Sequence, residues 1–224
     1  MAHRANKRPP GRIKSSIVAR LNTRLFFRLL GIYFTMDLLL LFLFCGGLFV
    51  WSEQQAAQIS TLVEERGVPS LELMERAANA LAEAAIDTAA NAPGRAVCFC
   101  GPGNNGGDGV ACARLLLEAG FEVRCILVGQ REKLTCDTRA MEARLAAAGG
   151  VLEPFTPDDP DFAAWCLKAD VMVDAIFGIG LNTEVRGDAL TAVHMMNTCD
   201  IPVVSADIPS GVEADTGRVL GEVV

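Results

Sequence analysis

The sequence predicts an α/β protein, a three-layer α-β-α sandwich built on a mostly parallel sheet. Half of its 224 residues are hydrophobic (51%), with 21 glycines and few aromatics, a composition typical of helices packed closely on a sheet. Short apolar runs without inside–outside alternation are separated by segments with helical periodicity, as in a sheet covered on both faces. The length suits one well-packed domain and is too short for two of ordinary size.

Two helices are expected at the beginning of this domain. Residues 52–55 have the pattern of a capping box, and apolar residues follow at helical spacing until Gly67 and Pro69 interrupt them. Ser70 opens the second helix, whose apolar positions recur until the turn-forming residues 91–94.

After residue 94, strand patterns and helix patterns alternate. Strands are expected at 96–100, 122–128, 151–153, 170–174 and 202–206. Helices are expected at about 109–119, 135–148, 162–167 and 189–197. Because ligands of such sheets bind beyond the carboxyl ends of the strands, functional residues are expected in the loops that follow the strands.

The first 51 residues have a different character from the rest. Residues 1–36 carry eight basic and no acidic side chains, and an uninterrupted apolar run extends from Leu38 to Trp51. The length fits a membrane anchor or the core of a targeting signal, and a start assigned too far upstream is a third alternative. We therefore divide the chain into a segment 1–51 and a domain 52–224, and expect a cytoplasmic location in preference to membrane association.

Charge and cysteine content exclude several classes of function. The residues after 36 include twelve basic and twenty-seven acidic side chains, so this acidic body is not expected to bind nucleic acid. Cys98, Cys100, Cys112 and Cys125 fall in strand or helix patterns, which favours buried free thiols in a reducing compartment. With two histidines in the whole chain, neither a zinc site nor a catalytic triad is expected.

The loop GPGNNGGDG (101–109) lies between a strand and a helix. Its glycines let the backbone approach an anion, and the helix start offers free N–H groups, so the pattern predicts a phosphate site. Hydride transfer is disfavoured, because the next strand ends at Gln130 without the acidic residue that reads the ribose of a redox dinucleotide. The loop also carries the polar side chains of Asn104, Asn105 and Asp108, which a turn that binds only pyrophosphate does not need.

Carboxylates follow two further strands. Asp174 closes one strand before a glycine-spaced loop, and Asp207 opens the segment DIPSG after another. Taken singly, each is explained by a helix cap or a turn. Three such loops at one edge of a sheet favour a shared binding site instead.

The motifs GPGNNGGDG, DAIFGIGL and DIPSGVEADTG, in this order, resemble the YjeF N-terminal domain of NAD(P)HX epimerases. Residues 67–81 are similar to the leading helical segment of that family, and the resemblance covers about 52–224. It implies a Rossmann-like sheet and an isomerase that interconverts the R and S forms of hydrated NADH or NADPH at the hydrated ring carbon. This reaction belongs to nicotinamide nucleotide repair and involves no net redox change.

The resemblance also implies a set of site residues. Those matching substrate-binding positions are Asn104, Asn105, Gly106, Gly107, Asp108, Gly178, Ile179, Gly180, Leu181, Asn182, Thr183, Glu184 and Asp207. Those matching ligands of a potassium ion are Asn105, Asp174 and Ser210, and their oxygen atoms suit a hard cation. A lysine that some relatives carry in the second loop has no counterpart at 181–183.

For catalysis we favour Asp207, because epimerising a carbon that bears a hydroxyl and a ring nitrogen requires proton transfer. Asp108 is the competing candidate, although its place in the first loop favours binding or positioning of the substrate.

The resemblance further implies a partner, an ADP- or ATP-dependent NAD(P)HX dehydratase that is either separate or fused, and it leaves a homodimer open. The family pattern continues beyond Val224, so a truncated C-terminus is expected. Two alternative functions stay open: a non-catalytic nucleotide-binding or interaction module, and the epimerase half of a bifunctional epimerase–dehydratase.

Overall fold

The computed structural model describes residues 69–224. The segment 1–51 and the helix expected after residue 52 lie outside the described residues.

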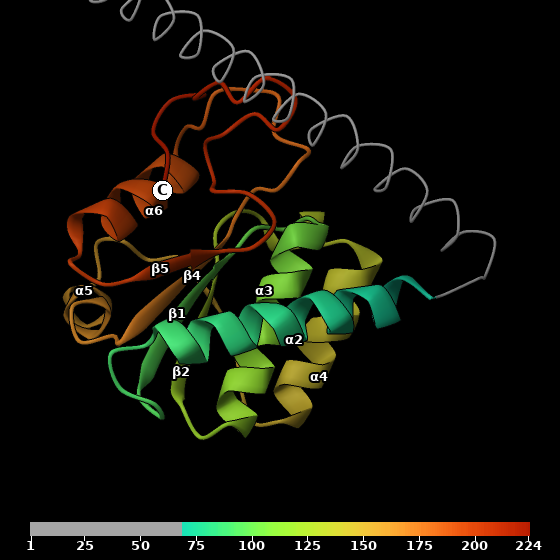
Figure 1. Cartoon of the computed structure of the whole chain (residues 1–224), viewed down its shortest axis with the longest axis vertical. Helices are drawn as coiled ribbons and strands as arrows, with labels where there is room; N and C mark the ends of the chain where they lie inside the picture. The colour runs from blue at the N-terminus through green and yellow to red at the C-terminus, as the bar shows by residue number, and fades with distance from the viewer. Residues whose placement is uncertain (1–68) are drawn as a thin grey trace, which may run out of the picture. The chain divides into compact units, whose positions relative to one another are not determined.

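The described residues form a five-stranded, wholly parallel sheet (Figure 1). Its strands are β1 (Arg95–Cys100), β2 (Glu122–Leu127), β3 (Leu152–Pro154), β4 (Val171–Ala175) and β5 (Val203–Ser205). They lie in the order β3-β2-β1-β4-β5. This architecture confirms the predicted α/β class.

Helices cover both faces of the sheet, as Figure 1 shows. One face carries α2 (Ser70–Thr88), α3 (Asn104–Glu118) and α4 (Cys136–Ala147), and the other carries α5 (Pro160–Cys166) and α6 (Asp188–Thr198). A short 3-10 helix, η1 (Arg131–Lys133), follows β2. Within residues 69–224, no helix is both long enough and apolar enough to cross a membrane.

The central strand β1 explains why the strand patterns lack alternation. Ala96, Cys98 and Cys100 pack toward α2, α3 and α4, whereas Val97 and Phe99 pack toward α5 and α6. Each of these side chains is fully buried, so both faces of the strand require apolar residues. The predicted buried free cysteines are confirmed at Cys98, Cys100, Cys112 and Cys125.

The start of α3 differs from the prediction. We expected the helix from about residue 109, but it begins at Asn104, and most of the expected glycine-rich loop forms its first turns. Gly106 and Gly107 are buried there, and a Cβ on Gly106 would overlap the carbonyl oxygen of Gly101. Close packing against the preceding loop thus outweighs the low helix propensity of glycine.

The strand order reverses between β1 and β4, which brings the ends of these two strands together. The N–H of Gly101 donates to the carbonyl of Ala175 (2.9 Å), and a Cβ at Gly101 would overlap the carbonyl oxygen of Ile176. The loops after β1 and β4 are therefore in backbone contact. A reversal of this kind creates the crevice in which α/β sheets bind ligands.

Candidate functional site

A cavity of about 910 Å³ opens at this crevice. Its walls come from α2, the N-terminal turns of α3, and the loops that follow β1, β4 and β5. Ala77, Ala80, Leu81 and Ala84 form the α2 wall. Pockets of this size accept ligands the size of small molecules and cofactors.

The N-terminus of α3 faces the cavity. Gly103 is the residue before the helix and offers no side chain to cap it, so the first backbone N–H groups stay free of a side-chain cap. The hydroxyl of Thr138 on α4 donates to the carbonyl of Gly103 (2.9 Å) and fixes this turn. Free N–H groups and the positive end of the helix dipole favour an anionic ligand here.

The amide of Asn105 is buried without a hydrogen-bond partner among the described residues, at both Oδ1 and Nδ2. It lies beside Gly178, since a Cβ built there would lie 3.2 Å from Asn105 Oδ1. Buried amides almost always have partners, so a side chain in this state indicates a site for a ligand or an ion.

Asp174 lies under the cavity at the end of β4 and is fully buried. Its carboxylate accepts hydrogen bonds from the Ser210 hydroxyl (2.5 Å) and N–H (2.8 Å), from the Ser205 hydroxyl (3.0 Å) and from the Ile176 N–H (3.3 Å). Burial raises the pKa of Asp174 above its ordinary value, although these hydrogen bonds act in the opposite direction. The loops after β4 and β5 are thus joined through one carboxylate.

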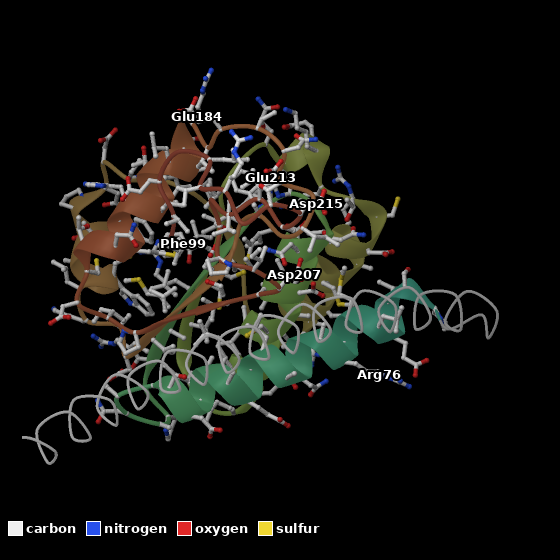
Figure 2. All side chains as sticks on the ribbon, turned by 45° about the horizontal axis from the view of Figure 1, so that its top comes forward. Arg76, Phe99, Glu184, Asp207, Glu213 and Asp215 are labelled. Atoms are coloured by element: carbon white, nitrogen blue, oxygen red, sulfur yellow. The ribbon has the colours of Figure 1, made fainter. Side chains whose placement is uncertain are left out.

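Asp207 lines the cavity from the loop after β5 and appears near the centre of Figure 2. Its backbone has a φ of 64°, a left-handed conformation that aspartate tolerates better than most residues. The Ile179 N–H donates to its Oδ2 (2.9 Å). Backbone strain held at a cavity wall is typical of functional positions.

Asp108 lines the same cavity from α3. Desolvation and, secondly, the nearby Asp207 carboxylate raise the pKa of Asp108 to about 7. None of the described residues that line the cavity is Lys, Arg or His. Two acidic side chains therefore share this space without a cationic side chain in its lining.

The structure brings together most of the substrate-binding residues expected from the sequence. Those that line the cavity are Asn104, Asn105, Asp108, Gly178, Ile179, Gly180, Leu181 and Asp207. Gly106 and Gly107 are buried within α3, and Asn182, Thr183 and Glu184 lie outside the lining. Glu184 is exposed and forms an ion pair with Arg186 (2.6 Å). In Figure 2 it lies near the top of the molecule, away from Asp207 at the centre.

Sequence reasoning missed the α2 wall, Thr135 and Ser205. The α2 residues recur at helical spacing, which is also the signal of a core-facing stripe, and their small side chains carry no chemical motif. The described residues contain no cluster of three or more His, Cys, Asp or Glu suited to a metal ion.

Comparison with models of known protein families identifies the family to which this chain belongs. The model described as "YjeF-related protein N-terminus" matches residues 70–224. The chain belongs to the YjeF N-terminal family. Its first loop, glycine-spaced second loop and DIPSG segment, which carried the resemblance, all surround or underlie the cavity.

Members of the YjeF N-terminal family that are similar to this chain have two architectures. An NAD(P)H-hydrate epimerase of Limosilactobacillus reuteri is 37% identical over 175 residues, which cover 78% of this chain and 79% of that protein. A bifunctional NAD(P)H-hydrate repair enzyme of Methanothermobacter thermautotrophicus is 38% identical over 75% of this chain but only 32% of its own length. The chain thus spans about a third of that bifunctional relative.

A solved structure agrees with this assignment to the YjeF N-terminal family. The crystal structure of yeast YNL200c superposes with a TM-score of 0.62 at 26% sequence identity. The match covers 74% of this chain and 72% of the yeast chain.

Proposed function

We propose that this chain is an NAD(P)H-hydrate epimerase, an isomerase that interconverts the R and S forms of hydrated NADH or NADPH in nicotinamide nucleotide repair. The observation that carries the proposal is the cavity itself. It combines a helix N-terminus for a diphosphate with the carboxyl group of Asp207 for proton transfer. Relatives more than 35% identical bear the epimerase name.

The substrate is proposed to lie between α3 and the loops after β4 and β5. Its diphosphate binds the N–H groups at the start of α3, next to Asn104 and Asn105. The backbone of 178–181 and the side chain of Asp207 contact the remainder. Asn182, Thr183 and Glu184 take part only if the bound substrate extends beyond the cavity lining.

Asp207 is proposed as the catalytic base. The N–H of Ile179 holds one carboxylate oxygen, which leaves the other for the substrate. Its left-handed backbone is maintained by the surrounding structure, which gives the carboxyl group a defined position on the cavity wall.

A potassium ion is proposed at Asn105, Asp174 and Ser210. The residues fit such an ion: the Asn105 amide is buried without a partner in the described part of the chain, and Asp174 is a buried carboxylate hydrogen-bonded only by neutral donors. Amide, carboxylate and hydroxyl oxygens match a hard cation. The ion would supply a positive charge that offsets the buried carboxylate beneath a negatively charged substrate.

The bifunctional relatives support a dehydratase partner that consumes the S form, either fused to this domain or separate. The buried free cysteines support a location in a reducing compartment such as the cytoplasm. A homodimer stays a prediction.

The proposal is tested by following the two epimers of hydrated NADH by chromatography, with and without the purified protein, in potassium buffer and in potassium-free buffer. We expect equilibration well above the spontaneous rate, with a marked loss when potassium is replaced by a bulky organic cation. Asp158→Asn, at an exposed position outside the cavity, is the matched control. A spontaneous rate with tight substrate binding would favour the non-catalytic nucleotide-binding module.

A further inference from the structure

We propose that Asp108 is a second catalytic carboxyl group, which acts with Asp207 as an acid–base pair on the hydrated ring carbon. The inference rests on the proposed epimerase function and goes beyond it by assigning a proton-holding role to a residue matched only to substrate binding.

The placement of the two carboxyl groups supports a pair. Asp207 Oδ2 would lie 2.6 Å from a Cβ built on Gly178, and the Asn105 amide contacts the same position. Asp108 follows Asn105 by three residues on α3, so both side chains lie on one face of the helix, and both line the cavity. The two carboxyl groups thus enter one cavity from different elements, α3 and the loop after β5.

Their hydrogen bonds assign different roles to the pair. Asp207 accepts a hydrogen bond from the Ile179 N–H, whereas none of the hydrogen bonds among the described residues reaches the Asp108 side chain. No basic side chain among the described lining residues balances two negative charges. A proton is therefore best held on Asp108, in agreement with the direction in which burial and Asp207 move its pKa.

The proposed step begins with proton transfer from the Asp108 carboxyl to the hydroxyl on the ring carbon. The carbon–oxygen bond breaks with its electron pair on oxygen, water leaves, and the lone pair of the ring nitrogen forms a carbon–nitrogen double bond. A water molecule then adds to the opposite face of the carbon while Asp207 takes its proton. Transfer of that proton from Asp207 back to Asp108 restores the pair, so no oxidant or reductant is consumed.

This arrangement suits an epimerase because the reaction must run in both directions. In the reverse direction each carboxyl group takes the other's role, as microscopic reversibility requires. A single base would leave the departing hydroxyl without an acid.

The test compares Asp108→Asn, Asp207→Asn and the control Asp158→Asn in the full chain, with hydrated NADH as substrate. We expect Asp108→Asn to lower kcat by about 100-fold or more, as for loss of a general acid, with KM changed less than about threefold. The wild-type rate should fall as the pH rises through about 7, and this limb should be absent from the residual activity of Asp108→Asn.

A second readout uses water labelled with heavy oxygen. Each turnover should place one solvent oxygen on the ring carbon, and epimerisation without label would overturn the proposed step. A normal kcat with a raised KM for Asp108→Asn would reduce Asp108 to a binding residue and overturn the proposal. If wild type itself does not epimerise, the proposed function fails. If wild type and Asp108→Asn are equally active, only the pair fails.

If Asp108→Asn does not fold, shown by loss of its circular dichroism signal, Asp108→Glu decides. It keeps the titratable group, so retention of the pH limb with a lowered kcat supports the pair. If Asp108→Glu has the wild-type kcat but its rate does not fall as the pH rises through about 7, the pair is overturned.

Discussion

Gly178 shows how one missing side chain shapes the site. An added Cβ would lie 2.6 Å from Asp207 Oδ2 and 3.2 Å from Asn105 Oδ1, closer than the carboxylate allows without shifting. Its backbone φ lies outside the left-handed region, so the constraint is the space beside the two side chains and not the conformation of the residue. A glycine here lets the carboxylate and the amide approach the same strand end.

Gly178→Ala is therefore expected to displace Asp207 and lower kcat/KM by about 100-fold, since small misplacements of reacting groups have effects of this size. The stability cost should be about 1 to 3 kcal/mol, the range for overpacking. Steady-state kinetics and urea unfolding measure the two effects. Gly180→Ala, whose Cβ meets no atom within 4 Å, is the control for stability and should unfold like wild type.

At the scale of elements, α4 holds the N-terminus of α3 in place. Thr135 caps α4 by accepting from the Thr138 N–H (3.2 Å), and the Thr138 hydroxyl donates to the carbonyl of Gly103 (2.9 Å). Thr138 is fully buried, so its hydroxyl has no alternative partner in solvent. The N-terminus of α4 thus supports the N-terminus of α3, although α3 comes earlier in the chain.

Thr138→Val keeps the shape of the side chain and removes this bond. Loss of this bond should cost about 0.5 to 1.5 kcal/mol of unfolding free energy, because the Gly103 carbonyl still accepts from the Gly107 N–H (3.1 Å). It should also raise KM for the substrate, because the anion-binding turn loses its support. Thr191→Val, which removes an exposed hydroxyl that bonds Gly187 (3.3 Å), is the matched control. Equal unfolding of the two variants would contradict the role of Thr138.

The elements also show what the sequence could predict. Strand patterns located the strands to within about two residues, because burial on both faces demands apolar runs. The strand-end position of Asp174 and Asp207 followed from those runs. The start of α3 could not be predicted, because it depends on the contact of Gly106 with the Gly101 loop. The unpartnered amide of Asn105 and the strained backbone of Asp207 depend likewise on tertiary packing.

At the scale of the whole molecule, the acidic cavity links function to stability. Asp108 has a pKa raised from 3.8 to about 7 on folding, so between these values the folded state binds more protons than the unfolded one. The associated stability is present at low pH and is lost as the pH rises through about 7. Burial moves the pKa of Asp174 in the same direction.

Asp108→Asn should therefore be more stable than wild type at about pH 8, by about 1 to 2 kcal/mol after allowance for solvent screening, and equally stable near pH 4. Urea unfolding across this range measures the difference, with Asp158→Asn as the control for removal of a surface charge. If the difference in unfolding free energy between Asp108→Asn and wild type does not change with pH, Asp108 does not titrate as described. Greater stability combined with lost activity would show that the wild-type residue is kept for function.

The backbone contact between Gly101 and the end of β4 has a further consequence for affinity. Because the turns after β1 and β4 are bonded to each other, and those after β4 and β5 are joined through Asp174, the base of the cavity is ordered when the chain folds. Little conformational entropy of the protein then remains to be lost on binding. The main entropic cost falls on the dinucleotide, whose flexible diphosphate linkage must adopt a shape that the protein already has.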